Sequence, residues 1–287
     1  MNWRTLADSF LSSLFEPPCA ACAQVLSSPL DGAVCQRCWA SIRRGALNER
    51  FAGRHAVDWA CAVDHYEGRL RDIIHALKYE RRRSIAKPLG GLMRESGAAL
   101  LQDVDLVVPV PLHPRRLRDR GFNQAEDLAR QLGLPVVGLL QRVKFTTSQI
   151  ELPAEERHQN VRDAFALTGN PKGLPPQFAL TGNPKGLPPQ FAMTGNPEGL
   201  PPQFAMTGNP EGLPPQFAMT GNPEGLPPQF TRSLGGGNPS GLPEVVVLVD
   251  DVSTTGATLE ACARVLKAAG VREVRALTAA RVATGRR

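Results

Sequence analysis

Apolar residues occur along this chain in two spacings that predict two kinds of element. Five consecutive apolar residues, Val245 to Val249, are mostly β-branched, and 104–110 is a second apolar run. Such runs are typical of strands that are buried on both faces, as in a parallel sheet. Between 70 and 77 the apolar residues instead recur three and four positions apart, which predicts a helix with one buried face.

Strand-like and helix-like segments alternate along the chain. In order, the patterns predict a strand at 59–63 that ends near Tyr66, helices at 70–77 and 84–101, a strand at 104–110, a helix at 124–132, a short strand near Val136, strands ending at Phe165 and Val249, and a helix at 259–269 closed by Gly270. This alternation favours an α/β fold in which helices cover both faces of a parallel sheet.

The turn after the Val245 strand is rich in carboxylates and hydroxyls. Free amide groups at the start of the next helix, together with hydroxyl groups around Gly256, form a cradle for an anion such as phosphate. The acidic pair, Asp250 and Asp251, would repel a phosphate, so we expect it to bind sugar hydroxyls or a metal. A sugar phosphate satisfies both halves. The alternative is an ordinary strand-to-helix turn with a threonine cap and two solvated acids.

The segment from Val246 to Thr258 resembles the 13-residue motif with which type I phosphoribosyltransferases bind phosphoribosyl pyrophosphate (PRPP). The resemblance implies that the acidic pair holds the ribose 2′- and 3′-hydroxyls, that the following loop holds the 5′-phosphate, and that Mg²⁺ accompanies PRPP. The expected PRPP-binding residues are Asp250, Asp251, Ser253, Thr254, Thr255, Gly256, Ala257 and Thr258.

Three other stretches narrow the resemblance to one family. Residues 66–80, 108–129 and 149–165 are similar, in matching order, to the ComF family, also called competence protein F or amidophosphoribosyltransferase-like proteins. The resemblance implies a zinc ribbon before a phosphoribosyltransferase domain, and a role in natural transformation with single-stranded DNA and DNA-uptake proteins as partners. The residues do not indicate an acceptor for the phosphoribosyl group. The competing hypothesis is a non-catalytic accessory protein that uses the fold as a scaffold to bind single-stranded DNA.

The predicted loop after the second apolar run carries four arginines. Arginine binds phosphate oxygens in bidentate fashion, so these side chains could neutralise a leaving pyrophosphate. Arg115 and Arg116 are candidate pyrophosphate ligands, and Arg118 and Arg120 are candidate catalytic residues. A solvated basic loop is the alternative. Lys78 is a further candidate for the phosphates, with a structural role as its alternative, and no general base can be named.

Four cysteines near the N-terminus follow the pattern C-x2-C-x12-C-x2-C. They are Cys19, Cys22, Cys35 and Cys38. Four thiolates at this spacing are typical of a closed tetrahedral Zn²⁺ site, which is structural and supplies folding energy to a short module. Reduced cysteines without a metal are the alternative. The other two, Cys61 and Cys262, are predicted to be small core residues.

A tandem repeat of 13 residues separates Phe165 from the Val245 strand. Five near-identical copies cover 165–229, and each contains Pro-Pro, Asn-Pro and two glycines, which exclude helix and interior strand. We expect 166–241 to be a disordered insertion in a surface loop. A proline-rich docking segment is the alternative.

Length and charge set the broad organisation. The 287 residues are enough for one α/β domain and a small module, and the net charge of +6 is compatible with phosphate or nucleic-acid ligands without identifying either. We expect an N-terminal helix and zinc ribbon over 1–50 and a phosphoribosyltransferase-like domain over 51–287. No apolar run approaches the ~20 residues needed to span a bilayer. With no secretory signal predicted, a cytoplasmic protein with reduced cysteines is expected.

Overall fold

The computed structural model describes residues 18–26, 32–43, 45–51, 53, 55–144, 161, 163–169 and 242–283. The predicted N-terminal helix, almost all of the 149–165 stretch and the repeats beyond 169 lie outside these residues, so the predictions made for them stay predictions.

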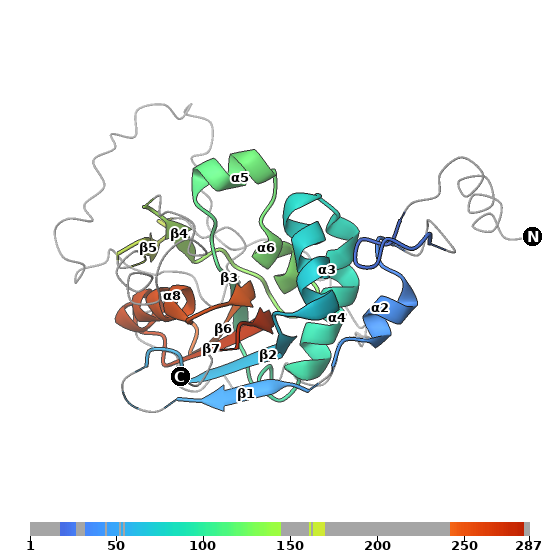
Figure 1. Ribbon diagram of the computed structural model, residues 1–287. Helices are drawn as coiled ribbons and strands as arrows, with labels where there is room; N and C mark the ends of the chain where they lie inside the picture. The colour runs from blue at the N-terminus through green and yellow to red at the C-terminus, as the bar shows by residue number, and fades with distance from the viewer. Residues whose placement is uncertain are drawn as a thin grey trace, which may run out of the picture. The chain divides into compact units, whose positions relative to one another are not determined.

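A five-stranded sheet forms the centre of the described chain, in the order β1-β2-β7-β6-β3 (Figure 1). Its strands are β1 (Leu47–Arg50), β2 (Trp59–His65), β3 (Leu106–Pro109), β6 (Val245–Ser253) and β7 (Glu273–Arg281). The strands β2, β7, β6 and β3 are parallel, and β1 is antiparallel at one edge. Parallel strands end at the same edge of a sheet, and ligands of such folds bind beyond that edge.

The helices follow the parallel strands, and a small second sheet lies outside the main one. The helices are α2 (Gln36–Ala40), α3 (Gly68–Tyr79), α4 (Ala86–Ser96), α5 (Pro114–Arg120), α6 (Gln124–Ala129) and α8 (Ala257–Ala268). The second sheet pairs β4 (Leu140–Arg142) with β5 (Phe165–Leu167) in antiparallel fashion. None of the helices in the described ranges is long and apolar enough to cross a bilayer.

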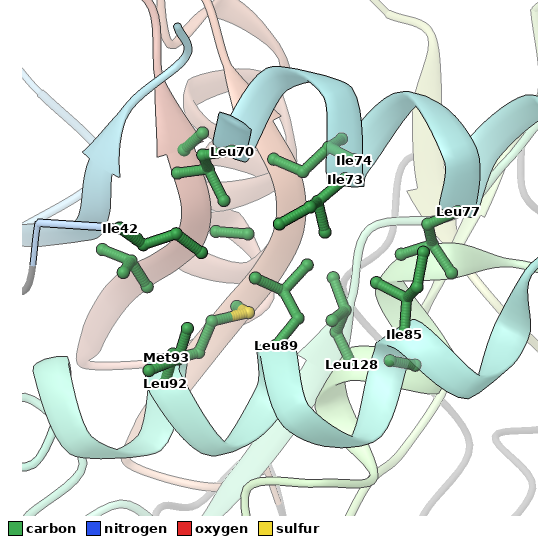
Figure 2. Packing of buried hydrophobic residues seen from close by; sticks show 14 of the residues in the cluster. Ile42, Leu70, Ile73, Ile74, Leu77, Ile85, Leu89, Leu92, Met93 and Leu128 are labelled. Carbon is green, nitrogen blue, oxygen red and sulfur yellow. The ribbon is translucent and has the colours of Figure 1, made fainter. Parts of the chain in front are cut away.

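Alternate residues of β6 belong to two hydrophobic clusters, one on each face of the sheet. Val247 and Val249 pack with the buried side chains of α3 and α4, and Figure 2 shows part of this cluster, including Ile73 and Met93. The neighbouring residues of β6 pack instead with Leu266 of α8 and with the β4–β5 pair. The predicted α/β fold with helices on both faces of a mostly parallel sheet is therefore confirmed.

The strand that carries the acidic pair is longer than its apolar run indicates. We expected a strand that ends at Val249, but β6 continues to Ser253 because Val252 and Ser253 pair with Ala280 and Arg281 of β7. Asp250 and Asp251 thus belong to the strand and not to the turn, and the strand alternation still governs where their side chains point.

The arginine-dense stretch is a helix where a loop was predicted. Pro114 occupies the first turn of α5, the imidazole of His113 accepts a hydrogen bond from the Arg115 amide at 3.2 Å, and Gly121 ends the helix at φ 82°. No residue of α5 is buried. Because a helix without a buried face has no hydrophobic periodicity, only its two ends indicated it in the sequence.

Three smaller differences concern element boundaries. We expected residues 1–50 to form a separate module, but β1 lies within this range and pairs with β2 in the main sheet. The helix expected over 84–101 is a short 3-10 turn followed by α4, which ends at Ser96. The strand expected near Val136 is a single bridge to Val107, and β4 was not predicted at all.

Candidate functional site

The two carboxylates of the acidic pair lie on opposite faces of the sheet. Asp250 is paired with Thr278 in β7 without a bulge, so consecutive side chains alternate between faces. Asp251 is on the face of Val247 and Val249, which α3 and α4 cover, and Asp250 is on the face that α8 covers. Each carboxylate therefore has its own set of neighbours.

Lys78, in the last turn of α3, is the partner of Asp251. Its ammonium nitrogen lies 2.7 Å from Oδ1 of Asp251, and the two side chains are only 17% and 9% exposed. Burial opposes the charged form of Lys78, but the carboxylates of Asp251 and Asp250 outweigh it and raise the pKa of Lys78. An ion pair so well shielded from water is broken only at a large cost in stability.

Asp250 has a different environment on the other face. Burial, followed by the charge of Asp251, raises the pKa of the Asp250 carboxyl from 3.8 to about 7, although Lys78 and Arg142 lower it in part. One of its oxygens, Oδ1, accepts a hydrogen bond from the Asp251 amide at 2.8 Å. A carboxyl group whose pKa is raised to near neutral pH in this way is typical of functional sites.

Arg142 was missed by the sequence reasoning. It ends β4, is 9% exposed, and stacks its guanidinium 5.2 Å from the ring centroid of Phe165. Burial, then the nearby charge of Arg116, lowers the pKa of Arg142. A buried arginine that interacts with both Asp250 and Arg116 connects the acidic pair to the arginines of α5.

The loop between β6 and α8 has the backbone expected of an anion cradle. Gly256 precedes the helix at φ 75°, and the Thr255 hydroxyl accepts a hydrogen bond from the Ala257 amide at 3.4 Å. Residues 253–256 line one side of a cavity of about 160 Å³, whose other walls include Phe51 and Arg281. The side chain of Ala257 is buried in the core, so only its backbone is available to a ligand.

The four arginines of α5 are not equivalent. Arg120 donates a hydrogen bond to Gln124 Oε1 at 2.7 Å and lies 5.4 Å from the ring centroid of Tyr79. Arg116 is half-buried and close enough to Arg142 for their charges to interact, whereas Arg115 and Arg118 are exposed. Among these arginines, Arg116 is thus the one whose charge acts on Arg142, whereas Arg118 is exposed.

The four cysteines form one compact cluster. Their sulfur atoms all lie within 4.8 Å of one another, with 3.9 Å between Cys19 and Cys38 and 3.8 Å between Cys22 and Cys35. A tetrahedral zinc with Zn–S distances of about 2.3 Å needs sulfurs about 3.8 Å apart. The cluster therefore has the dimensions of a zinc site.

The surroundings of the Cys19 sulfur also fit a thiolate ligand. Burial raises the pKa of Cys19, but hydrogen bonds from the backbone amides of Cys35, Ala21 and Cys22 outweigh burial and lower it to about 6. Hydrogen bonds of this kind orient a thiolate and support its charge. The cysteine segment packs on the main core, in the same cluster as Leu70 of α3.

The sequence of this chain is similar to a known domain family and to several named proteins. A family model described as a phosphoribosyl transferase domain matches residues 227–287, which include the acidic pair, the cradle and α8. The chain is 30% identical to DNA utilization protein YhgH of Salmonella typhimurium over 171 residues, which are 54% of this chain and 73% of that protein.

Two further relatives align over shorter stretches. The chain is 31% identical to Competence protein F of Haemophilus influenzae over 123 residues, or 39% of this chain and 54% of the relative. It is 35% identical to DNA utilization protein YhgH of Escherichia coli over 118 residues, or 37% of this chain and 51% of the relative. The chain thus spans about half the length of these two proteins. Because the Salmonella alignment covers most of that relative and a phosphoribosyl transferase model matches the segment that holds the site, the chain belongs to the ComF family of phosphoribosyltransferase-type proteins.

Proposed function

We propose that this protein binds PRPP, or a closely related sugar phosphate, at the carboxyl edge of β6. The observation that carries the proposal is that the acidic pair and the cradle occupy one edge of the parallel sheet, Asp250 and Asp251 at its end and Gly256 at the start of α8. Carboxylates accept hydrogen bonds from ribose hydroxyls, and the free amides and dipole of a helix N-terminus favour a 5′-phosphate.

The proposal extends to the other end of the ligand. Transfer would break the bond between C1 of the ribose and pyrophosphate and form a bond from C1 to an acceptor nucleophile. We assign the pyrophosphate oxygens to Arg116 and to Arg115 on the same helix. The charge of Arg116 acts on Arg142, which in turn interacts with Asp250. Arg118, which is exposed, and Arg120, which donates a hydrogen bond to Gln124, stay candidates for a catalytic role.

Metal ions have two separate places in the proposal. The four cysteines would hold one structural Zn²⁺, since the cluster has four thiols, matching sulfur distances and supporting amides. Mg²⁺ would accompany PRPP and neutralise charge on its pyrophosphate. In the described part of the chain the cysteine cluster is the one group of three or more His, Cys, Asp or Glu residues placed to hold a metal, so the acidic pair offers Mg²⁺ at most two ligands.

The proposal is tested by calorimetric titration of PRPP, ribose 5-phosphate and inorganic phosphate. Replacing both Asp250 and Asp251 with Asn keeps the size of the side chains and, near pH 8, removes two charged acceptors worth ~1.5–3 kcal/mol each, so PRPP affinity of the folded variant should fall at least about tenfold. Ribose 5-phosphate should weaken similarly because it has the same hydroxyls, whereas inorganic phosphate should not weaken.

A matched control is available elsewhere in the chain. Asp103 and Asp163 are both exposed and both have φ 55°, a conformation that Asn tolerates, so their double Asn variant removes the same charge away from the site. That control should bind all three ligands as the parent does. If the variant of the acidic pair binds PRPP as tightly as the parent, these carboxylates are not ribose ligands and the proposal fails.

A second function is supported by the outer surface of α5. Arg118 is exposed, Leu117 is 42% exposed, and Tyr79, next to Arg120, is 56% exposed. An exposed aromatic ring with an arginine beside it is typical of sites where single-stranded nucleic acid stacks its bases, although His75 already packs against part of the Tyr79 ring. The relatives named Competence protein F and DNA utilization protein lead us to link this protein with DNA uptake.

The two functions differ in their response to salt. Binding of single-stranded DNA at α5 should weaken steeply with salt, and Tyr79→Ala should weaken it further by removing the stacking ring. PRPP affinity should not respond to Tyr79→Ala. DNA binding that persists in high salt, or that Tyr79→Ala leaves unchanged, would remove α5 from consideration.

A further inference from the structure

We propose that Lys78 is a built-in counter-cation of the acidic pair, a positioning residue that holds the Asp251 side chain in place so that the sugar phosphate binds without a divalent metal. This inference rests on the proposed function and assigns a separate role within it. Mg²⁺ would then enter with the pyrophosphate of PRPP and not with the sugar.

The first support is the way in which the ammonium is held. Lys78 belongs to the last turn of α3, and the residues just before it, including Ile74 and Leu77, are fully buried in the core. A helix anchored in this way leaves the lysine little freedom, so its nitrogen stays 2.7 Å from the Asp251 carboxylate. Loop residues, by contrast, would lose more entropy to hold the same contact.

The second support is the charge balance around the ammonium. Lys78 interacts with Asp251 first, then with Asp250 and with the hydroxyl of Tyr66. Two adjacent carboxylates in a shielded site repel each other, and a cation that interacts with both offsets that repulsion. A divalent ion usually has this role, but here a side chain of the protein occupies the position next to Asp251.

The third support is the lack of room for a metal at the pair. Mg²⁺ requires near-octahedral oxygen ligands, and Asp250 and Asp251 lie on opposite faces of β6. One oxygen of Asp251, Oδ1, is already bound by the ammonium. A metal at Asp251 would therefore have to compete with an ammonium that both carboxylates already hold.

Titration of ribose 5-phosphate, which lacks pyrophosphate, tests the inference directly. The parent should bind it equally well in EDTA and in Mg²⁺. In EDTA, Lys78→Met should weaken binding by about tenfold or more, and Mg²⁺ should restore part of the loss because the metal can now reach Asp251. Lys78→Arg keeps the charge and should retain most of the affinity without metal. Lys87→Met removes an exposed lysine of α4 and serves as the control.

Each outcome has a distinct meaning. If the parent binds ribose 5-phosphate only with Mg²⁺, Lys78 is not the counter-cation, while the proposed function stands. If folded Lys78→Met binds in EDTA as the parent does, the inference is also overturned, and thermal melting of each variant shows whether it is folded. The parent measurement needs no variant, so an unfolded Lys78→Met leaves the test intact. If the parent binds no sugar phosphate in either condition, the proposed function fails and the inference fails with it.

Discussion

Replacing Asp250 with Asn should make the protein more stable at neutral and basic pH. The folded protein holds the carboxyl proton with a pKa of about 7, against 3.8 for an ordinary aspartate. The native state therefore binds this proton more tightly than the unfolded chain does. Ionisation of Asp250 therefore destabilises the folded protein. This destabilisation is absent below about pH 4, grows as pH rises, and levels off above about pH 7.

The size of the effect follows from the shift. A rise of about three pKa units corresponds to about 4 kcal/mol at about 1.4 kcal/mol per unit, reached in full near pH 8 and by about half near pH 5.5. Asn keeps an oxygen that can accept the hydrogen bond from the Asp251 amide, but this uncharged acceptor forms a weaker bond than a carboxylate. We therefore expect a gain in unfolding free energy of ~2–4 kcal/mol near pH 8, and about half of it near pH 5.5.

The neighbouring substitution should have the opposite sign. Asp251→Asn leaves the shielded ammonium of Lys78 without its carboxylate, and removal of one member of a buried ion pair costs ~3–5 kcal/mol. Two identical chemical changes at adjacent positions are thus expected to move stability in opposite directions. The reason is that the two side chains point to opposite faces of β6 and have different neighbours.

Urea unfolding of the parent and both variants, near pH 5.5 and near pH 8, measures these differences. The midpoint and slope of each transition give the unfolding free energy, and an unchanged slope shows that the variants unfold from a comparable state. If Asp250→Asn is no more stable than the parent near pH 8, the environment we describe for Asp250 is wrong. A gain that does not change with pH would contradict its titration as the cause.

Three other predictions concern separate parts of the chain. Purified protein should contain about one zinc per chain. Cys35→Ser should release it and lower the melting temperature, because the cysteine segment packs on the main core. A variant that retains all of its zinc would contradict the site. Deletion of 178–229, four copies of the repeat, should change the melting temperature by only a few degrees, and a large loss would show that the tract packs on the domain. Gly256→Ala should lower the free energy of unfolding by ~1–2 kcal/mol, because alanine is strained at the positive φ of this position. A Cβ there meets no atom within 4 Å, so no steric clash adds to the strain. Equal stability of variant and parent in urea would show that the loop relaxes.

The parts of the fold that repeat a hydrophobic pattern could be predicted from the sequence. The buried strands β3 and β6 and the helices α3 and α8 have the apolar runs or spacing that their burial requires. Gly270, at φ 107°, ends α8 where a glycine was expected to close it. Elements without a buried face have no such pattern, which is why α5 was taken for a loop and β4 was not foreseen.

Part of the candidate site could likewise be predicted from the sequence, and part could not. Side chains next to one another in sequence, such as the acidic pair and the cradle, were found because the motif is continuous. Arg142 is separated from Asp250 by more than a hundred residues, and only the pairing of β4 with β5 brings it to the α8 face. Its single signal in the sequence was an arginine two positions after an apolar residue, which is too common to single out.

Strand alternation would have predicted more of the site had β6 been given its full length. If the strand continues past Val249, Asp250 and Asp251 must point to opposite faces, because side chains alternate along every strand. Two carboxylates on two faces cannot both contact one basic side chain directly, so a second basic residue is expected on the other side. One face is covered by the helix that follows β2, and Lys78 is the lysine at the end of that helix. The partner of Asp251 was therefore within reach of sequence reasoning, whereas the partner of Asp250 required the second sheet, which no pattern in the chain indicates.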